Sequence, residues 1–319
     1  MRKTGITILI LLSTIVIVIV IIAEYNSTRP GKRPANPFAY DVDEFKPVDA
    51  ELLQWKEARQ ISLEGSAPRA MAFRKGHIYL VTGIDLQVIA GDWSRVLRKT
   101  LPSPASCLTL AEDGRIIIVF DNHLAVLNPT GDVIEQSEQM TGTQFTSVAF
   151  YDNNIYVADA TGRRVLIFNS GLEQIGEFKG ESGVSDIHGF IVPGGHFSLA
   201  VNPENELWIT NPGLHAMQNY TPNGRLRSYI QNSSFGIEGF SGCCNPVHFT
   251  FLSSGEFVTS EKGIIRIKVM KESGEVVSVV ATPEQFEGGT RAPALAVDDE
   301  GNVLALDFDR NMIRIFEPI

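Results

Sequence analysis

Cysteine is scarce in this chain of 319 residues, which contains only Cys107, Cys243 and Cys244. Three cysteines are too few for a disulfide-stapled scaffold, so the fold has to rest on a hydrophobic core. Positive charge is also in short supply, because 27 Lys and Arg stand against 37 Asp and Glu, for a formal net charge of −10. This acidic balance predicts that the main domain does not bind nucleic acid.

The sequence also lacks the common local signatures of catalysis. It contains no GxSxG elbow, P-loop, HExxH motif or Rossmann fingerprint. Four-cysteine ligation of an iron–sulfur cluster is excluded within the chain by the cysteine count. The sequence therefore identifies no catalysed reaction, and it favours a protein that is not an enzyme.

Long apolar runs are absent except at the N-terminus, where residues 6–23 are broken by only three hydroxyl side chains. A helix of this length spans about 27 Å, close to the ~30 Å hydrocarbon core of a bilayer. Arg2 and Lys3 precede the run and favour a cytoplasmic N-terminus. The alternative is a cleaved signal peptide, which would export the remainder as well. We expect four segments: a cytoplasmic N-terminus (1–5), a transmembrane signal-anchor (6–23), a proline-containing extended linker (24–56) and an all-β domain (57–319) on the extracytoplasmic side, periplasmic or at the cell surface.

A faint repeat runs through the all-β segment. Each unit starts with alternating small and apolar residues, continues through a polar turn such as 112–114, and enters a second apolar strand. The units start 37 to 51 residues apart, at Ala70, Cys107, Ser147, Ser198, His248 and Ala294. Units of this length with up to four short strands are typical of propeller blades, whose innermost strands crowd the axis and favour small residues. The spacing predicts a six-bladed β-propeller.

The last unit is one strand short, since the chain ends soon after Phe316. A strand-like segment at 57–63 precedes the first unit. We expect this segment to supply the missing outer strand and to close the ring, which removes an open edge that would invite aggregation.

Two stretches resemble the NHL-repeat signature: residues 155–168, and more loosely residues 305–316. The resemblance covers about residues 60–319 and implies a six-bladed propeller, in agreement with the repeat count. It does not imply one function, because NHL-type propellers include protein-binding and RNA-binding modules as well as enzymes such as the peptide-amidating lyases.

A second likeness is more particular. Residues 236–246 (GIEGFSGCCNP), followed by 258–263, resemble a GFxGCCNP motif of a bacterial NHL group. That group has a further cysteine where this chain has Ser241. Because of this difference, metal chemistry does not carry over from the resemblance.

In a propeller, the loops that lead into the innermost strands lie on one face, around the axis, and binding sites are usually found there. The long connections precede the fourth and fifth units, at 180–195 and 233–247. The expected ligand-binding face therefore comprises His196, His215, Cys243, Cys244, Asn245, His248, Glu261, Lys262 and Arg291. Within this set, Glu261 and Lys262 are either a functional ion pair at the rim or, as the sequence favours, a solvated surface pair. Arg291 either holds an anionic ligand or, as the sequence favours, belongs to a plain surface loop.

His248 occupies a column that is filled by small residues in the other five units. We expect its imidazole to point into the axial opening. The simpler interpretation is that the local tunnel has room for it.

The adjacent pair Cys243–Cys244 has three interpretations. It forms a vicinal disulfide, strained because neighbouring Cα atoms lie ~3.8 Å apart, below the usual range of about 4.4–6.8 Å. Alternatively, its thiolates bind copper or zinc together with His248, four residues further on. The third interpretation is a pair of buried small apolar side chains.

These patterns lead to one hypothesis and two rivals. We expect a membrane-anchored, extracytoplasmic NHL-type propeller that acts as a binding module through its axial face, with another protein or a small ligand as its partner. The first rival is a redox or metal-dependent protein that uses Cys243, Cys244 and His248. The second is a lyase or hydrolase with a histidine-held metal in the central tunnel.

Overall fold

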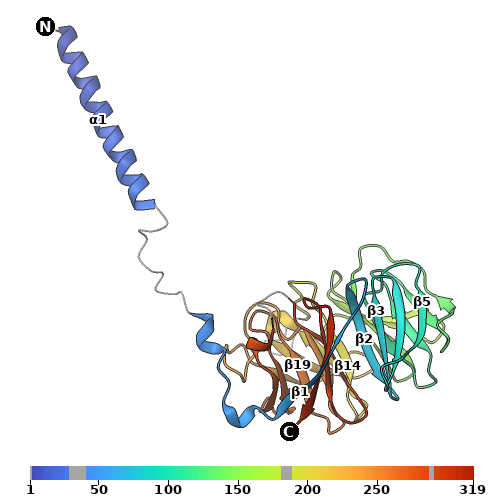
Figure 1. The fold of residues 1–319 in the computed structure, drawn as a ribbon. Coiled ribbons are helices and arrows are strands. Elements are labelled where there is room, and N and C mark those ends of the chain that lie inside the picture. Colours follow the sequence, from blue (N-terminus) through green and yellow to red (C-terminus); the bar gives the residue numbers. More distant parts are fainter. Residues whose placement is uncertain (1, 29–40, 181–188, 287–290) are drawn as a thin grey trace. The chain divides into compact units, whose positions relative to one another are not determined.

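The computed structural model describes residues 2–28, 41–180, 189–286 and 291–319, and it divides into two compact units, Met1–Glu44 and Phe45–Ile319. In the first unit, the expected transmembrane segment is helix α1 (Arg2–Thr28), drawn in Figure 1. Its stretch Gly5–Ser27 has a mean hydropathy of 3.3 and is long and apolar enough to span a membrane. Residues 24–28 of the predicted linker are thus helical, and residues 29–40 lie outside the described part of the chain.

The second unit is a six-bladed β-propeller. In the described residues, six antiparallel four-stranded sheets follow one another, and five of them take four consecutive strands. These five blades are β2 (Pro68–Arg74), β3 (His77–Thr82), β4 (Asp85–Ala90) and β5 (Arg95–Thr100); β6 (Cys107–Leu110), β7 (Ile116–Val119), β8 (Leu124–Leu127) and β9 (Val133–Gln136); β10 (Phe145–Tyr151), β11 (Asn154–Asp159), β12 (Arg164–Phe168) and β13 (Gln174–Phe178); β14 (Leu199–Val201), β15 (Leu207–Asn211), β16 (Ala216–Tyr220) and β17 (Leu226–Gln231); and β18 (His248–Phe251), β19 (Phe257–Ser260), β20 (Ile267–Met270) and β21 (Val276–Ala281).

The sixth blade joins the two ends of the all-β segment. It consists of β22 (Ala294–Val297), β23 (Val303–Asp307), β24 (Met312–Pro318) and β1 (Trp55–Ser62). Strand β1 pairs antiparallel with β24, from Trp55 opposite Pro318 to Ser62 opposite Met312. In Figure 1 the blue β1 accordingly runs beside the red C-terminal strand. The predicted ring closure is confirmed, with a strand that starts two residues earlier than expected.

The hydrophobic core lies between the blades. The central strands β7 and β8 are buried at every position, which explains their continuous apolar sequences IIIV and LAVL. In outer strands such as β5, by contrast, every residue is exposed or only half-buried. Each pair of neighbouring blades encloses one cluster of buried apolar side chains. The inner strands contact each other around the ring, with β22 against β2, so this core is continuous around the axis.

Residues 45–54, which precede β1, pack on the propeller and do not form an extended spacer. They include the short 3-10 helix Ala50–Leu52, and the 3-10 helix Val42–Phe45 ends at their first residue. The Phe45 ring lies 5.3 Å from the Phe235 ring, and the Trp55 indole donates a hydrogen bond to Ser278 Oγ at 2.9 Å. The described part of the predicted linker from residue 45 onward therefore belongs to the propeller unit.

Candidate functional site

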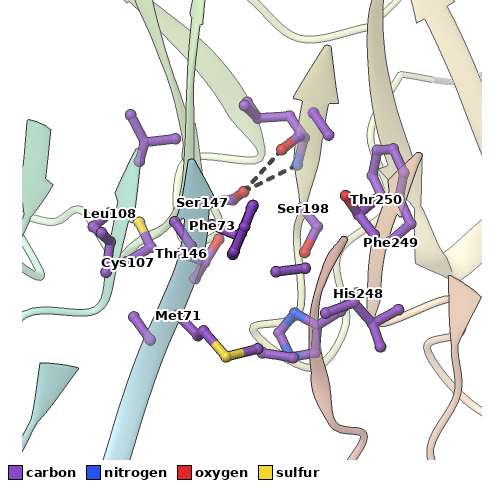
Figure 2. Close-up of a pocket in the computed structure, with 18 of the residues that line it drawn as sticks. Met71, Phe73, Cys107, Leu108, Thr146, Ser147, Ser198, His248, Phe249 and Thr250 are labelled. Carbon is purple, nitrogen blue, oxygen red and sulfur yellow. Dashed lines mark hydrogen bonds between the residues drawn. The ribbon is translucent and has the colours of Figure 1, made fainter. Parts of the chain in front are cut away.

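The inner strands enclose a channel along the propeller axis, with a cavity of about 280 Å³. The first residues of all six sequence repeats line this cavity: Ala70, Cys107, Ser147, Ser198, His248 and Ala294. Figure 2 shows the His248 imidazole projecting into the space between the inner strands. The small-residue column of the sequence is therefore the wall of the axial channel.

His248 is the bulky member of this column and begins strand β18. Burial lowers the pKa of its imidazole to about 4, and the nearby His196 contributes to the shift. The Phe308 ring lies 6.3 Å from the imidazole between centroids. His248 is therefore neutral near pH 7, so one ring nitrogen donates a hydrogen bond and the other accepts one.

A second cavity, of about 310 Å³, shares part of its wall with the channel, including Arg69, Thr146 and His248. We call it the axial mouth. All six blades contribute to its lining: Arg69, Ser106, Asp121, Gln144, Thr146, His196, Ser198, His248, Arg291 and Phe308 are among its residues. These residues come from the first positions of the inner strands, from the loops that enter those strands and from the connections between second and third strands. The mouth therefore lies on the face where the sequence predicts ligand binding.

Two arginines of the axial mouth are oriented by contacts with the propeller. Arg69 Nε donates to the Ala105 carbonyl at 2.8 Å. Arg291 donates to the Phe308 carbonyl at 2.8 Å and to Asp309 Oδ1 at 3.3 Å, and its guanidinium lies 5.1 Å from the Phe308 ring centroid. A guanidinium has five N–H donors, so these contacts use only part of each group. The mouth thus holds two guanidinium groups with spare hydrogen-bonding capacity, of which Arg291 is already paired with Asp309.

His196 stands beside the cysteine pair as well as in the mouth. A Cβ added to Gly194 would lie 3.1 Å from Cys244 Sγ and 3.6 Å from His196 Cδ2, so both groups flank this glycine. Burial lowers the pKa of His196, and the positive charge of Lys262 lowers it further. The Lys262 charge also acts on the Cys244 thiol. The structure therefore groups His196, Lys262 and Cys244 next to the axial mouth.

Cys243 and Cys244 are free thiols in the structure, and their Sγ atoms lie 2.7 Å apart. Cys243 is exposed, whereas Cys244 is 3% exposed. Burial raises the pKa of the Cys244 thiol to about 11, and its hydrogen bond with Cys243 acts in the same direction. The two sulfurs thus differ: Cys243 meets solvent, and Cys244 is a protected thiol that keeps its proton.

The expected copper or zinc site of Cys243, Cys244 and His248 is not assembled. Across the described ranges, no group of three or more His, Cys, Asp or Glu side chains is placed to hold a metal ion. A zinc site requires three or four ligands at about 2.0–2.3 Å. The reason is the path of the loops, which set Cys244 against Gly194 and His196 while His248 lines the channel.

The expected rim ion pair between Glu261 and Lys262 is replaced by a buried ion cluster. Glu261 is fully buried, and its Oε1 lies 3.0 Å from Arg266 Nε and 3.0 Å from Lys268 Nζ. Burial lowers the pKa of Lys268 to about 8 although Glu261 opposes that shift. Arg266 and Lys268 also donate to the Gly239 carbonyl, so the cluster fastens the loop that leads to the cysteines. Glu261 therefore has a structural position instead of a place on the ligand-binding face.

Asn245 is likewise a structural residue of this loop. Its side chain is buried and donates to the carbonyls of Ser241, at 2.5 Å, and Lys262, at 2.9 Å. Its Oδ1 accepts from the Lys262 backbone N–H at 2.9 Å. Asn245 thereby fixes the cysteine loop to the connection that carries Lys262.

His215 is separate from the other candidates. It follows the 3-10 helix Pro212–Leu214 with a left-handed backbone at φ 54°, and it does not line either axial cavity. Its buried Nδ1 has no hydrogen-bond partner in the described residues. The predicted set is thus split: His196, His248 and Arg291 line the mouth, and Lys262 and the cysteines adjoin it.

The sequence reasoning missed several residues of the mouth, above all Arg69, Asp121, Gln144 and Thr146. A signal for some of them was present in the repeat. Five mouth residues directly precede the column residues of their blades: Arg69, Ser106, Thr146, Phe197 and Val247. Reading the position before each repeat start would have found these five.

Comparisons with known proteins support the fold alone. No family model and no curated protein sequence matches the chain. Among solved structures, a streptogramin B lyase is similar with a TM-score of 0.57 and 12% identity, over 85% of this chain and 100% of the other. A virginiamycin B lyase from Staphylococcus aureus matches with a TM-score of 0.52 and 16% identity, over 83% and 89%. A protein of unknown function from Bacteroides caccae matches with a TM-score of 0.54 and 16% identity, over 73% and 83%. These likenesses bear out the six-bladed propeller, and the NHL resemblance stays a prediction.

Proposed function

We propose that this chain is a membrane-anchored binding module that takes a small anionic ligand in the axial mouth, outside the cytoplasm. The observation that carries the proposal is the pair of oriented arginines, Arg69 and Arg291, in one cavity of a chain with a net charge of −10. Asp121 is the acidic residue in that lining, and Asp309 pairs with Arg291 at 3.3 Å. Guanidinium groups bind carboxylates and phosphates through paired N–H donors, so a carboxylate-bearing or phosphate-bearing molecule fits this chemistry.

The other mouth residues suit a compact polar ligand. The cavity of about 310 Å³ is within the range of small-molecule sites. His196 and His248 have lowered pKa values, so they offer neutral imidazoles to a ligand. The Ser198 hydroxyl donates to the Val247 carbonyl at 2.7 Å and braces the backbone beside His248. The hydrogen bonds of the propeller therefore hold the backbone of the mouth in place without a ligand.

Localisation follows from α1 as part of the same proposal. The helix supplies the anchor, and the positive charges at Arg2 and Lys3 favour retention of the N-terminus in the cytoplasm. The propeller would then face the extracytoplasmic side. The lyases with a similar fold share too little sequence to transfer their reaction, so the proposal is for binding.

The test uses the full-length chain in detergent, with citrate as the anionic probe and putrescine as the cationic one. Thermal unfolding is recorded with each probe at constant ionic strength, and affinity is measured by calorimetry. Because a ligand that binds the folded state stabilises it, we expect citrate to raise Tm by a few degrees at saturating concentration.

Arg69→Gln and Arg291→Gln should each remove most of the citrate effect. The matched control is Arg98→Gln, which makes the same charge change on β5, where Arg98 pairs with Asp85 at 2.7 Å outside the mouth. Stabilisation by putrescine but not citrate would contradict the anionic ligand class. An equal loss of the citrate effect in Arg98→Gln would contradict the site.

A further inference from the structure

The cysteine pair is a chemical feature that the proposed binding function does not use. Neither Cys243 nor Cys244 lines the axial channel or mouth. The two sulfurs nevertheless contact each other at the surface of a well-fastened loop. A pair of adjacent thiols that is only structural would be expected to bury both side chains, and here Cys243 is exposed.

The loop holds the two sulfurs in unequal environments. Cys244 is 3% exposed and packs beside Gly194, whereas Cys243 is open to solvent. In thiol–disulfide exchange, an accessible thiolate attacks first and a second thiol then resolves the mixed disulfide. Exposure therefore assigns the attacking role to Cys243 and the resolving role to Cys244.

Positive charge and a base lie next to the pair. The Lys262 ammonium acts on the Cys244 thiol and lowers its pKa against the larger effect of burial. His196 flanks the same glycine as the Cys244 sulfur, and its lowered pKa leaves it neutral and able to accept a proton. Cationic groups and imidazoles are the usual neighbours of reactive cysteines.

The backbone of the pair is held in an uncommon conformation. Cys244 has a φ of 69°, a left-handed value that non-glycine residues seldom adopt, and Gly242 has a φ of 71°. The surroundings enforce this shape through the buried hydrogen bonds of Asn245 and through Glu261 Oε2, which accepts from the Ser241 N–H at 3.3 Å. Such enforced backbone conformations are concentrated at functional sites.

We propose that Cys243–Cys244 is a thiol–disulfide exchange site that reacts with small-molecule disulfides. The Cys243 thiolate attacks one sulfur of R–S–S–R, forms a mixed disulfide and releases one thiolate. The Cys244 thiol then gives up its proton to solvent, attacks Cys243 Sγ and expels the second thiolate, and the two released thiolates take up the two protons that the cysteines have lost. The protein loses two hydrogens and is oxidised to a vicinal disulfide, while the small disulfide is reduced to two thiols; the reverse reaction restores the pair.

The test follows this order of attack in the full-length chain, with oxidised glutathione as the disulfide. After acid quenching, intact mass and peptide mapping distinguish a glutathione adduct from an internal disulfide. The native chain should lose two hydrogens at residues 243–244 without accumulating adduct. Cys107 serves as the internal control, because burial raises the pKa of its thiol to about 12 and should leave it unmodified.

Single serine variants separate the two roles. Cys244→Ser should trap the glutathione adduct on Cys243, because the resolving thiol is gone. Cys243→Ser should react at least about tenfold more slowly, since the remaining thiol is buried and protonated. Equal rates in the two variants, or oxidation only to disulfides between two copies of the chain, would overturn the proposal. Citrate binding plays no part in these readouts, so this result is separable from that of the binding function.

Discussion

Arg314 and Glu57 join the last strand of the propeller to its first by two hydrogen bonds of 2.7 Å, Nε to Oε1 and Nη2 to Oε2. The guanidinium is almost completely buried, and it also donates to the Gln285 carbonyl at 2.7 Å. Aromatic rings flank it, with the centroids of Phe286 and Phe316 at 4.7 and 5.5 Å. The closure of the ring therefore depends on a paired charge as well as on backbone hydrogen bonds.

Glu57→Gln should destabilise the propeller by about 1.5–3 kcal/mol, because it replaces two charge-assisted hydrogen bonds to a buried guanidinium and leaves Asp307 Oδ2, 3.6 Å away, as the remaining carboxylate beside Arg314. The measurement is the urea midpoint of the full-length chain. Glu317→Gln is the matched control on the partner strand, since its pair with Lys56 is solvent-exposed and should contribute less than about 1 kcal/mol. Equal effects of the two substitutions would contradict the role of the buried pair.

Removal of β1 should destabilise the domain more than removal of the anchor does. A chain that starts at residue 64 leaves the outer edge of β24 unpaired, and such edges promote aggregation. A chain that starts at Phe45 keeps β1 and is the control. Melting temperature and light scattering compare the two. The closure role would be disproved by identical melting and no aggregation in the shorter chain.

Glu261→Gln should cost about 3–5 kcal/mol, because Arg266 and Lys268 would remain as two buried cations without a carboxylate. Glu275→Gln is the control, because its pair with Lys271 is solvent-exposed and should contribute less than about 1 kcal/mol. The free energy of unfolding of both variants decides the point. A small loss in Glu261→Gln together with a large loss of citrate binding would place Glu261 in the ligand site instead.

Stability should fall as the pH drops from about 6.5 toward 4, in part through His248. The unfolded histidine takes up a proton near pH 6.5, whereas the folded one has a pKa of about 4. Protons therefore favour the unfolded chain in this window, and the stability is fully present above it. The loss from this residue should be about 2–3 kcal/mol by pH 4.

His248→Gln should remove that part of the pH dependence. Urea midpoints at pH 7 and pH 4.5 give the comparison, with His77→Gln as the control at the start of β3. His196 also has a lowered pKa, so some pH dependence should persist in His248→Gln. An unchanged slope in His248→Gln would show that the channel histidine does not titrate as described.

The local pattern of small and apolar residues in the sequence was sufficient to predict the architecture of this protein. Small residues recur at Ala70, Cys107 and Ser147 because an innermost strand meets its neighbours at the axis. That constraint acts on every blade in the same way, so it repeats along the chain and can be read without a structure. The strand at Trp55–Ser62 followed from the same logic, since the last unit lacked a partner for β24.

The candidate site could be predicted only in part from the sequence pattern. His196, His248 and Arg291 were found because they fall on entry loops or in the repeat column. Glu261 was placed wrongly at the rim because adjacency to Lys262 in sequence suggested a solvated pair. Its actual partners, Arg266 and Lys268, come from the next strand and its lead-in, and only strand pairing turns all three toward one buried point.

The amino-acid sequence by itself thus determined the apolar helix, the six blades and the face that carries the long loops, because each depends on hydrophobic period and repeat length. Tertiary structure alone decided which polar groups meet. Arg69 and Arg291 are more than 200 residues apart in the chain and share one cavity only because the ring closes. Cys244 and His196 both flank Gly194 because two neighbouring entry loops pack against each other there, a contact that no sequence spacing records.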